Sequence, residues 1–177
     1  IPRDVYNELT KINENVLTDI DIFFKEDNSI KIGITGTNRK STTAFHLQQL
    51  FDKFESTSLV GNIGNTLLDN MNKTKYSIIE LSSFQLDKMI ENKLDYGILL
   101  NIDKDHLDYH GNFKSYKKAK EKILQAKKSI SNELDPYKLF YWVTNKEATQ
   151  INFENLPYRY QSISEHIIND SKSTNFN

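Results

Sequence analysis

The sequence predicts an α/β fold built on a doubly wound, mostly parallel sheet. Short runs of β-branched residues alternate with helical patterns from Ile30 onward, which is typical of strands joined by crossover helices. The first run leads into a glycine-containing turn and a Lys-Ser-Thr sequence that opens a helix. Polar clusters follow three of the predicted strands, at the ends where sheets of this kind bind ligands.

Length and composition limit the classes of protein to consider. The chain has 177 residues, enough for one full domain, or for one domain with fragments of its neighbours. Its net charge of −1, from 23 Lys and Arg against 24 Asp and Glu, does not suggest a nucleic-acid partner. The sequence has no cysteine, no apolar run of membrane-spanning length and no signal-peptide pattern. We therefore expect a cytoplasmic protein that binds neither nucleic acid nor membranes.

The first residues look like the middle of a longer polypeptide, because the chain begins without an initiator Met. The segment VLTDIDIFF, Val16 to Phe24, is predicted to form a strand or a turn that packs against the rest of the protein. From Ile30 to Thr35, isoleucines alternate with Lys31 and Gly33, which predicts a buried strand that ends in a turn.

A helix is expected to begin near Ser41 and to pack one face on the core. The apolar residues that recur at helical spacing are Leu47, Leu50, Phe51 and Phe54. The remaining predicted strands are Ser58–Val60, Tyr76–Glu80, Tyr96–Asn101 and Leu139–Val143, and a further helix is predicted at about Phe113–Lys128.

The stretch GITGTNRKSTT, Gly33 to Thr43, has the arrangement of a phosphate-binding loop. Backbone N–H groups of the turn and of the helix N-terminus point at an anion, Lys40 adds a charge, and the Ser41 hydroxyl is suited to Mg²⁺. The alternative is an ordinary turn with a solvated Lys40. Arg39 occupies a position where the general pattern has glycine, and a side chain there costs about 1–2 kcal/mol if φ is positive. We expect Arg39 to weaken nucleotide binding.

The three polar clusters at strand ends supply further candidates. Gly61 to Asn65 is by itself a glycine-rich loop. Glu80 ends an apolar strand, where it is well placed to hold Mg²⁺ directly or through water, or else to pair with a nearby lysine. His106 beside Asp105 follows another apolar strand and is a candidate functional histidine.

Lys120 is an anomaly in the helix predicted at Phe113–Lys128. It lies four residues after Tyr116 and three before Ile123, on the apolar stripe of that helix. The usual explanation is a side chain that extends its ammonium past the stripe into water. The alternative is a partly desolvated lysine with a lowered pKa that takes part in chemistry.

Seven separated strings agree in type and order with one family, and the sequence resembles the Mur ligases. The strings are GITGTNRKSTT, GNIG, ELSSFQL, LNIDKDHLDYHG, YKKAKEKI, LPYRY and INDSKSTN. ELSSFQL and INDSKSTN are similar to the type that adds D-glutamate to UDP-N-acetylmuramoyl-L-alanine. The resemblance covers most of Leu17 to Ile123 and two short stretches near the end, and it implies the P-loop sheet of the family's central domain.

The resemblance implies a site of several kinds of residue. Nucleotide binding is implied for Gly36, Thr37, Asn38, Lys40, Ser41, Thr42, Arg159, Asp170 and Lys172. Mg²⁺ binding is implied for Ser41, Glu80, His106 and Lys120, which matches the family's carbamylated lysine. Substrate contact is implied for Asn62, Ser82, Gln85 and Thr174, and catalytic roles for Lys40, His106 and Lys120. The implied reaction transfers a phosphoryl group from ATP to the substrate carboxylate, and D-glutamate attacks the resulting acyl phosphate.

The resemblance also implies a domain organisation. We expect residues 1–27 to end an N-terminal domain, residues 28–160 to form the central domain, incomplete after about 128, and residues 161–177 to begin a C-terminal domain. The family's N-terminal UDP-binding domain is not found in the sequence, which indicates either a partial chain or a decayed gene product. We favour a partial chain of a larger, monomeric ligase and expect this fragment alone to be inactive. The alternatives are a folyl-polyglutamate-synthase-like ligase and a catalytically silent nucleotide-binding module.

Overall fold

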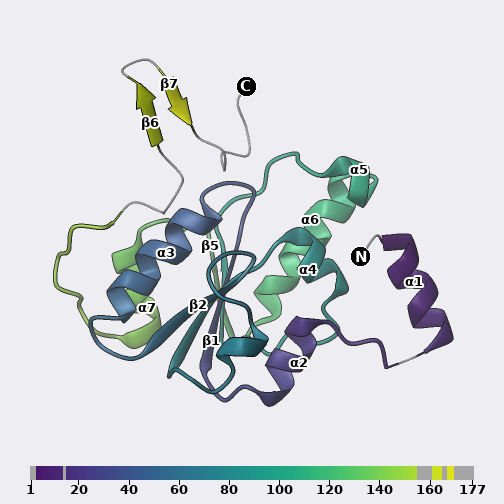
Figure 1. Cartoon of the computed structure of the whole chain (residues 1–177), viewed down its shortest axis with the longest axis horizontal. Coiled ribbons are helices and arrows are strands. Elements are labelled where there is room, and N and C mark those ends of the chain that lie inside the picture. The colour runs from purple at the N-terminus through teal and green to yellow at the C-terminus, as the bar shows by residue number, and fades with distance from the viewer. Residues whose placement is uncertain (1–2, 14, 155–160, 165–166, 170–177) are drawn as a thin grey trace.

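The computed structural model describes residues 3–13, 15–154, 161–164 and 167–169. Its centre is a five-stranded, all-parallel sheet in the order β2-β3-β1-β4-β5, with helices on both faces (Figure 1). The strands of this sheet are β1 (Ile30–Thr35), β2 (Thr57–Gly61), β3 (Tyr76–Glu80), β4 (Tyr96–Leu99) and β5 (Lys128–Ser131). The predicted α/β fold with a doubly wound parallel sheet is confirmed.

Different helices cover the two faces of the sheet. They are α1 (Arg3–Ile12), α2 (Asp19–Glu26), α3 (Lys40–Phe51), α4 (Ser83–Lys88), α5 (Leu107–His110), α6 (Phe113–Glu121) and α7 (Pro136–Thr144), with the 3₁₀ turns η1 (Leu68–Asn70) and η2 (Lys122–Gln125). Ile78 shares a hydrophobic cluster with α3 and α7, whereas the next residue, Ile79, shares another with α2, α4 and η2. Both isoleucines are fully buried, as expected for a parallel strand covered on both faces.

The strand predicted at Leu139–Val143 is wrong, because this segment belongs to α7. Asp135 caps the helix by accepting a hydrogen bond from the backbone of Tyr137, and Pro136 occupies the first turn. Phe140 packs edge-on against Phe51 of α3, with ring centroids 4.8 Å apart. A short apolar run has the same appearance in a buried strand and in a buried helix, so periodicity alone did not separate them.

The helix predicted at Phe113–Lys128 is too long. It ends at Glu121, continues as η2 and gives way to β5, which the sequence analysis missed. β5 is an edge strand in which Ile130 is half-buried and the other three residues are exposed. Its Lys and Ser residues protect the free edge, and the same polar residues hide the strand from hydrophobic patterning.

The segment Val16–Phe24 is also corrected, since most of it lies in helix α2. Thr18 and Asp21 form a reciprocal cap at the start of this helix. Near the other end of the chain, β6 (Gln161–Ser164) and β7 (Ile167–Asn169) form a separate antiparallel pair. Among the residues that the model describes, no helix combines the length and apolar character needed to cross a bilayer.

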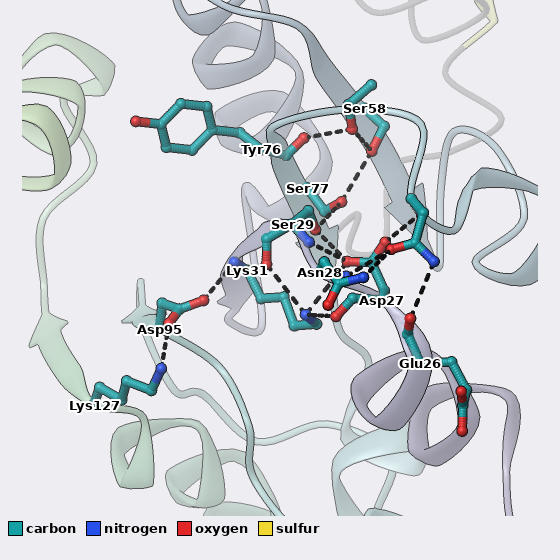
Figure 2. Close-up of polar contacts among 12 residues, drawn as sticks. Glu26, Asp27, Asn28, Ser29, Lys31, Ser58, Tyr76, Ser77, Asp95 and Lys127 are labelled. Carbon is teal, nitrogen blue, oxygen red and sulfur yellow. Dashed lines mark hydrogen bonds and ion pairs between the residues drawn. The ribbon is translucent and has the colours of Figure 1, made fainter.

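A polar network closes the amino ends of the central strands (Figure 2). The Lys31 ammonium lies 3.3 Å from an Asp27 carboxylate oxygen and donates to the carbonyls of Asp27 and Ser29, at 2.6 and 3.1 Å. The Ser29 hydroxyl donates to the same Asp27 oxygen and contacts the Ser77 hydroxyl at 2.7 Å, which in turn lies 3.2 Å from that of Ser58. These buried groups satisfy one another and join α2 to β1, β2 and β3.

Candidate functional site

The loop between β1 and α3 is held in place by the end of β4. The carbonyl of Asn101 accepts the Thr37 N–H at 3.0 Å. The Asn101 side chain accepts the Asn38 N–H at 2.8 Å and donates to the Asn38 carbonyl at 3.0 Å. Asn101 begins the third polar cluster noted in the sequence, but its role as the clamp of this loop was not predicted.

The Thr37 side chain connects the loop to α6. Its hydroxyl accepts the Asp103 N–H at 2.9 Å and lies 2.9 Å from the Tyr116 hydroxyl. Burial is the main cause that raises the pKa of Tyr116 to about 12, so this phenol keeps its proton at neutral pH. Tyr116 was expected only as part of an apolar stripe, and its contact with the loop was missed.

The first turn of α3 brings polar groups to the carboxyl edge of the sheet. Arg39 stands at the N-cap with φ 65° and ψ 6°, so the glycine position of the loop does have a positive φ. The Lys40 ammonium donates to the Thr37 carbonyl at 2.9 Å. Burial lowers the pKa of Lys40, and the carboxylates of Glu80 and Asp105 partly offset this.

Glu80 ends β3 with its side chain fully buried. One carboxylate oxygen accepts a hydrogen bond of 2.9 Å from the Asn62 amide, and the other has no hydrogen-bond partner among the described residues. Gly61 lets the chain pass close to the backbone of Glu80. It has φ 103°, and a Cβ at this position would lie 2.4 Å from the Glu80 carbonyl oxygen. The described residues show no direct ion pair between Glu80 and a lysine, so the predicted lysine pairing is not found.

Lys120 turns inward toward the same loop. Its residue is 2% exposed, and its ammonium donates to the Gly36 carbonyl at 2.7 Å and to the Thr35 hydroxyl at 3.3 Å. The ammonium also lies 5.1 Å from the centre of the Tyr116 ring. Burial, followed by repulsion from Lys40, lowers the pKa of Lys120 to about 7. The explanation by a side chain extended into water is therefore wrong.

His106 lies at the same edge but faces outward. It has φ 48° and stands at the N-cap of α5, with its ring 42% exposed and its Nε2 3.5 Å from an Asp105 oxygen. The ring packs on Phe84 and Tyr116, at centroid distances of 4.8 and 6.3 Å. His106 is thereby connected to the Thr37 and Lys120 region through Tyr116.

The remaining predicted residues form three groups. Ser82 and Gln85 cap each other at the start of α4, where the Ser82 hydroxyl accepts the Gln85 N–H and the Gln85 amide oxygen accepts the Ser82 N–H. Gly36, Ser41 and Thr42 lie in the loop and the first turn of α3, and the buried Thr42 hydroxyl has no partner among the described residues. The predictions that lie outside the described residues are Arg159, Asp170, Lys172 and Thr174.

The structure therefore brings Lys40, Glu80 and Lys120 to one edge of the sheet, with Asp105 close enough to affect both lysines. It does not assemble a metal cage from side chains alone. No group of three or more His, Asp or Glu residues suited to holding an ion is found in the described part of the chain.

Comparison with known proteins agrees with this arrangement. Residues 34–176 match the model of the Mur ligase middle domain, and the chain belongs to that family. A UDP-N-acetylmuramoylalanine--D-glutamate ligase of Francisella tularensis subsp. novicida (strain U112) is 40% identical over 126 residues, which make up 67% of this chain and 30% of that protein. Its counterpart from subsp. tularensis (strain WY96-3418) is 39% identical over the same length. The chain thus spans about 30% of the length of these curated relatives.

One solved structure has a similar fold. It is MurF ligase from Thermotoga maritima in complex with ADP, with a TM-score of 0.51 and 21% sequence identity. The match covers 66% of this chain and 32% of that one. At this identity the likeness extends to the fold and supports the sheet topology described above.

Proposed function

We propose that this chain is the ATP-binding part of an ATP-dependent amide ligase of peptidoglycan precursor synthesis. The observation that carries the proposal is the convergence of Lys40, Glu80 and Lys120 on a phosphate-type loop, with one buried carboxylate oxygen of Glu80 left without a hydrogen-bond partner among the described residues. The finer proposal is that the complete protein adds D-glutamate to UDP-N-acetylmuramoyl-L-alanine. It is supported by the names of the similar curated proteins and by the strings ELSSFQL and INDSKSTN.

The donor set fits Mg²⁺. This cation prefers oxygen ligands, keeps several waters and needs only one or two carboxylates from the protein. The free oxygen of Glu80 and the hydroxyl of Ser41 are such ligands. His106, the third candidate, offers a nitrogen and faces outward, so it contributes only after its ring turns toward the site. When bound, Mg²⁺ supplies neutralisation of phosphate charge.

The residues of the chain position the phosphates. The amides at the start of α3 favour an anion, and Lys40 exchanges its bond to the Thr37 carbonyl for one to the β- or γ-phosphate. Asn101 and Tyr116 hold the loop so that these donors are aimed before the ligand arrives. A phosphoryl group passes from ATP to the substrate carboxylate, and ADP is the leaving group. The amine of D-glutamate then attacks the carbonyl carbon of the acyl phosphate and loses a proton, and inorganic phosphate leaves as the amide bond forms.

Lys120 has the environment of a lysine that takes up CO₂. With a pKa of about 7, a large fraction is neutral and nucleophilic at physiological pH. Carbamylation replaces the ammonium with a carboxylate close to Glu80. Two such carboxylates repel each other unless cations lie between them, which ties this modification to the proposed metal site.

The domain limits and the substrate contacts are part of the proposal. Residues 1–27 are the end of a preceding domain and its linker, and the linker includes α2, which packs on the central sheet. Residues 28–160 belong to the central domain and residues 161–177 to the start of a following one. Asn62, Ser82 and Gln85 are the residues that we propose to contact the muramoyl substrate. Because nucleotide and both substrates must be held together, the chain alone binds ATP without ligating.

Calorimetric titration of the chain with ATP, with and without Mg²⁺, tests the nucleotide site. Glu80→Ala is expected to abolish the Mg²⁺-dependent part of the binding and to spare the rest. Glu121→Ala, which removes an exposed carboxylate at the far end of α6, is the matched control and is expected to change neither. Equal Mg²⁺ dependence in wild type and Glu80→Ala would remove Glu80 from the metal site.

The full-length protein tests the reaction. We expect phosphate release from ATP only when both UDP-N-acetylmuramoyl-L-alanine and D-glutamate are present. A protein that binds ATP but releases no phosphate with them would instead be a silent nucleotide-binding module, which is the alternative that the strained Arg39 favours.

A further inference from the structure

Arg39 combines a strained backbone with an unengaged charge. Its φ of 65° places it in the left-handed region, which is unfavourable for a residue with a long side chain. Strain of this kind persists only where the surrounding structure enforces it, and it is concentrated at functional sites. Arg39 stands at the start of α3, where its carbonyl accepts the first helical hydrogen bond, from Thr43.

The side chain of Arg39 differs from those of the two lysines at the same edge. The Lys40 ammonium is bound to the Thr37 carbonyl and the Lys120 ammonium to the Gly36 carbonyl. Arg39 is exposed, and its guanidinium makes no hydrogen bond or ion pair with any residue that the structure describes. It is therefore a cation at this loop that meets an anion without first breaking an internal bond.

We propose that Arg39 is a phosphate-binding residue whose guanidinium contacts the phosphate chain of the nucleotide. This contact takes the place of the close approach of backbone to phosphate that a glycine would allow. This inference rests on the proposed function. It is the reverse of the effect expected from the sequence, which was that Arg39 in place of glycine weakens nucleotide binding. The strain is already present in the folded chain, so it lowers the stability of the protein, while the charge increases its affinity for phosphate.

Four variants of the 177-residue chain separate charge from backbone strain. Arg39→Lys keeps the charge, Arg39→Gln removes it at similar length, and Arg39→Asn and Arg39→Gly remove it with residues that tolerate a positive φ. Lys53→Gln removes an exposed cation just beyond the opposite end of α3 and serves as the control. Affinity for ATP and ADP in the presence of Mg²⁺ is measured by calorimetry at low and high ionic strength, and thermal unfolding is recorded without nucleotide.

We expect Arg39→Gln, Arg39→Asn and Arg39→Gly to weaken ATP binding about tenfold at low ionic strength, the effect of one charge-assisted hydrogen bond. The loss is smaller for ADP, which carries less charge, and it shrinks at high ionic strength. Arg39→Lys retains most of the affinity, and Lys53→Gln all of it. Arg39→Asn and Arg39→Gly unfold at the same temperature as wild type or higher, which shows that the weaker binding does not come from a damaged fold.

The opposite results overturn the proposal. If Arg39→Asn or Arg39→Gly binds ATP as tightly as wild type or more tightly, the guanidinium does not contact the phosphates and Arg39 merely obstructs the loop. A wild-type chain that binds no ATP overturns the nucleotide site itself, and the role of Arg39 with it. The first result leaves the proposed function standing and the second does not, so the two failures are distinguishable.

Discussion

The two edges of the central sheet treat buried charge in opposite ways. At the amino edge, both oxygens of Asp27 are hydrogen-bonded, and the Lys31 ammonium is paired with one of them (Figure 2). At the carboxyl edge, one oxygen of Glu80 has no partner among the described residues, and Lys120 is held by neutral oxygens. All four of these charged residues are buried, so burial does not explain the difference.

Positive φ is not confined to one edge, since Asn72 of the amino-edge network has φ 58°. Arg39 and His106, both at the carboxyl edge, have positive φ and stand at helix N-caps without a side-chain cap. A protein that completes its own polar network gains rigidity, whereas one that leaves charges incomplete bears a cost that a ligand can remove. The comparison indicates that the amino edge stabilises the fold and that the carboxyl edge is prepared for a ligand.

The largest expected effect is on activity and comes from Lys120→Ala in the full-length enzyme. Removal of the lysine is expected to abolish ligation while the protein stays folded, because the variant also removes a buried charge whose desolvation opposes folding. Formate or acetate is expected to restore part of the activity by replacing the carboxylate of the carbamate. Phosphate release and circular dichroism measure the two properties, and normal activity in the variant would contradict the role of Lys120.

The next effect is on stability and comes from the other edge. Asp27→Ala leaves the Lys31 ammonium buried without its carboxylate, which is expected to lower the free energy of unfolding by about 3 kcal/mol. Lys127→Ala breaks the exposed ion pair with Asp95 at 2.7 Å and is expected to change stability little. Urea unfolding measures both variants.

The ATP affinity of Asp27→Ala tests whether the two edges act independently. We expect the folded fraction of Asp27→Ala to bind ATP as wild type does, since the substitution lies at the edge away from the phosphate loop. Weaker binding by folded Asp27→Ala would show that the two edges are coupled, and the division of roles between them would then be incorrect.

The sequence was sufficient for those parts of the site that local patterns determine. The end of an apolar strand identified Glu80, and the apolar stripe of α6 identified Lys120 as a lysine in the wrong surroundings. Both are buried at the predicted edge. The order of strand, glycine turn and helix also located the loop correctly.

Other features depend on contacts between distant residues and could not be predicted from such patterns. Asn101 contacts a loop residue 63 positions away in the sequence, and Tyr116 contacts one 79 positions away. Neither contact leaves a local pattern in the sequence. The amino-edge network has the same character, since Ser29 meets Ser77 across 48 residues. β5 escaped because an exposed edge strand carries few apolar residues to reveal it.

A pH dependence of stability further sharpens the comparison. The pKa of Asp27 is lowered in the folded chain, with hydrogen bonds from Asn72 and Ser29 and the charge of Lys31 outweighing the opposing effect of burial. The stability that Asp27 contributes is therefore present above its ordinary pKa of 3.8 and is lost as the pH falls through the folded value. The amino edge therefore loses this contribution to stability in the acidic pH range.

At the carboxyl edge, stability is expected to change with pH in the alkaline range. The pKa of Lys120 is about 7 in the folded chain and 10.5 ordinarily, so between these values the unfolded chain binds more protons. Stability then rises with pH across that interval, and below pH 7 the cost of burying the charge is fully present. Lys120→Met, which fills the same space without a charge, is expected to remove this slope and to raise stability at pH 7. Urea unfolding across the interval measures the slope in both proteins, and an equal slope in wild type and Lys120→Met would show that Lys120 does not titrate there.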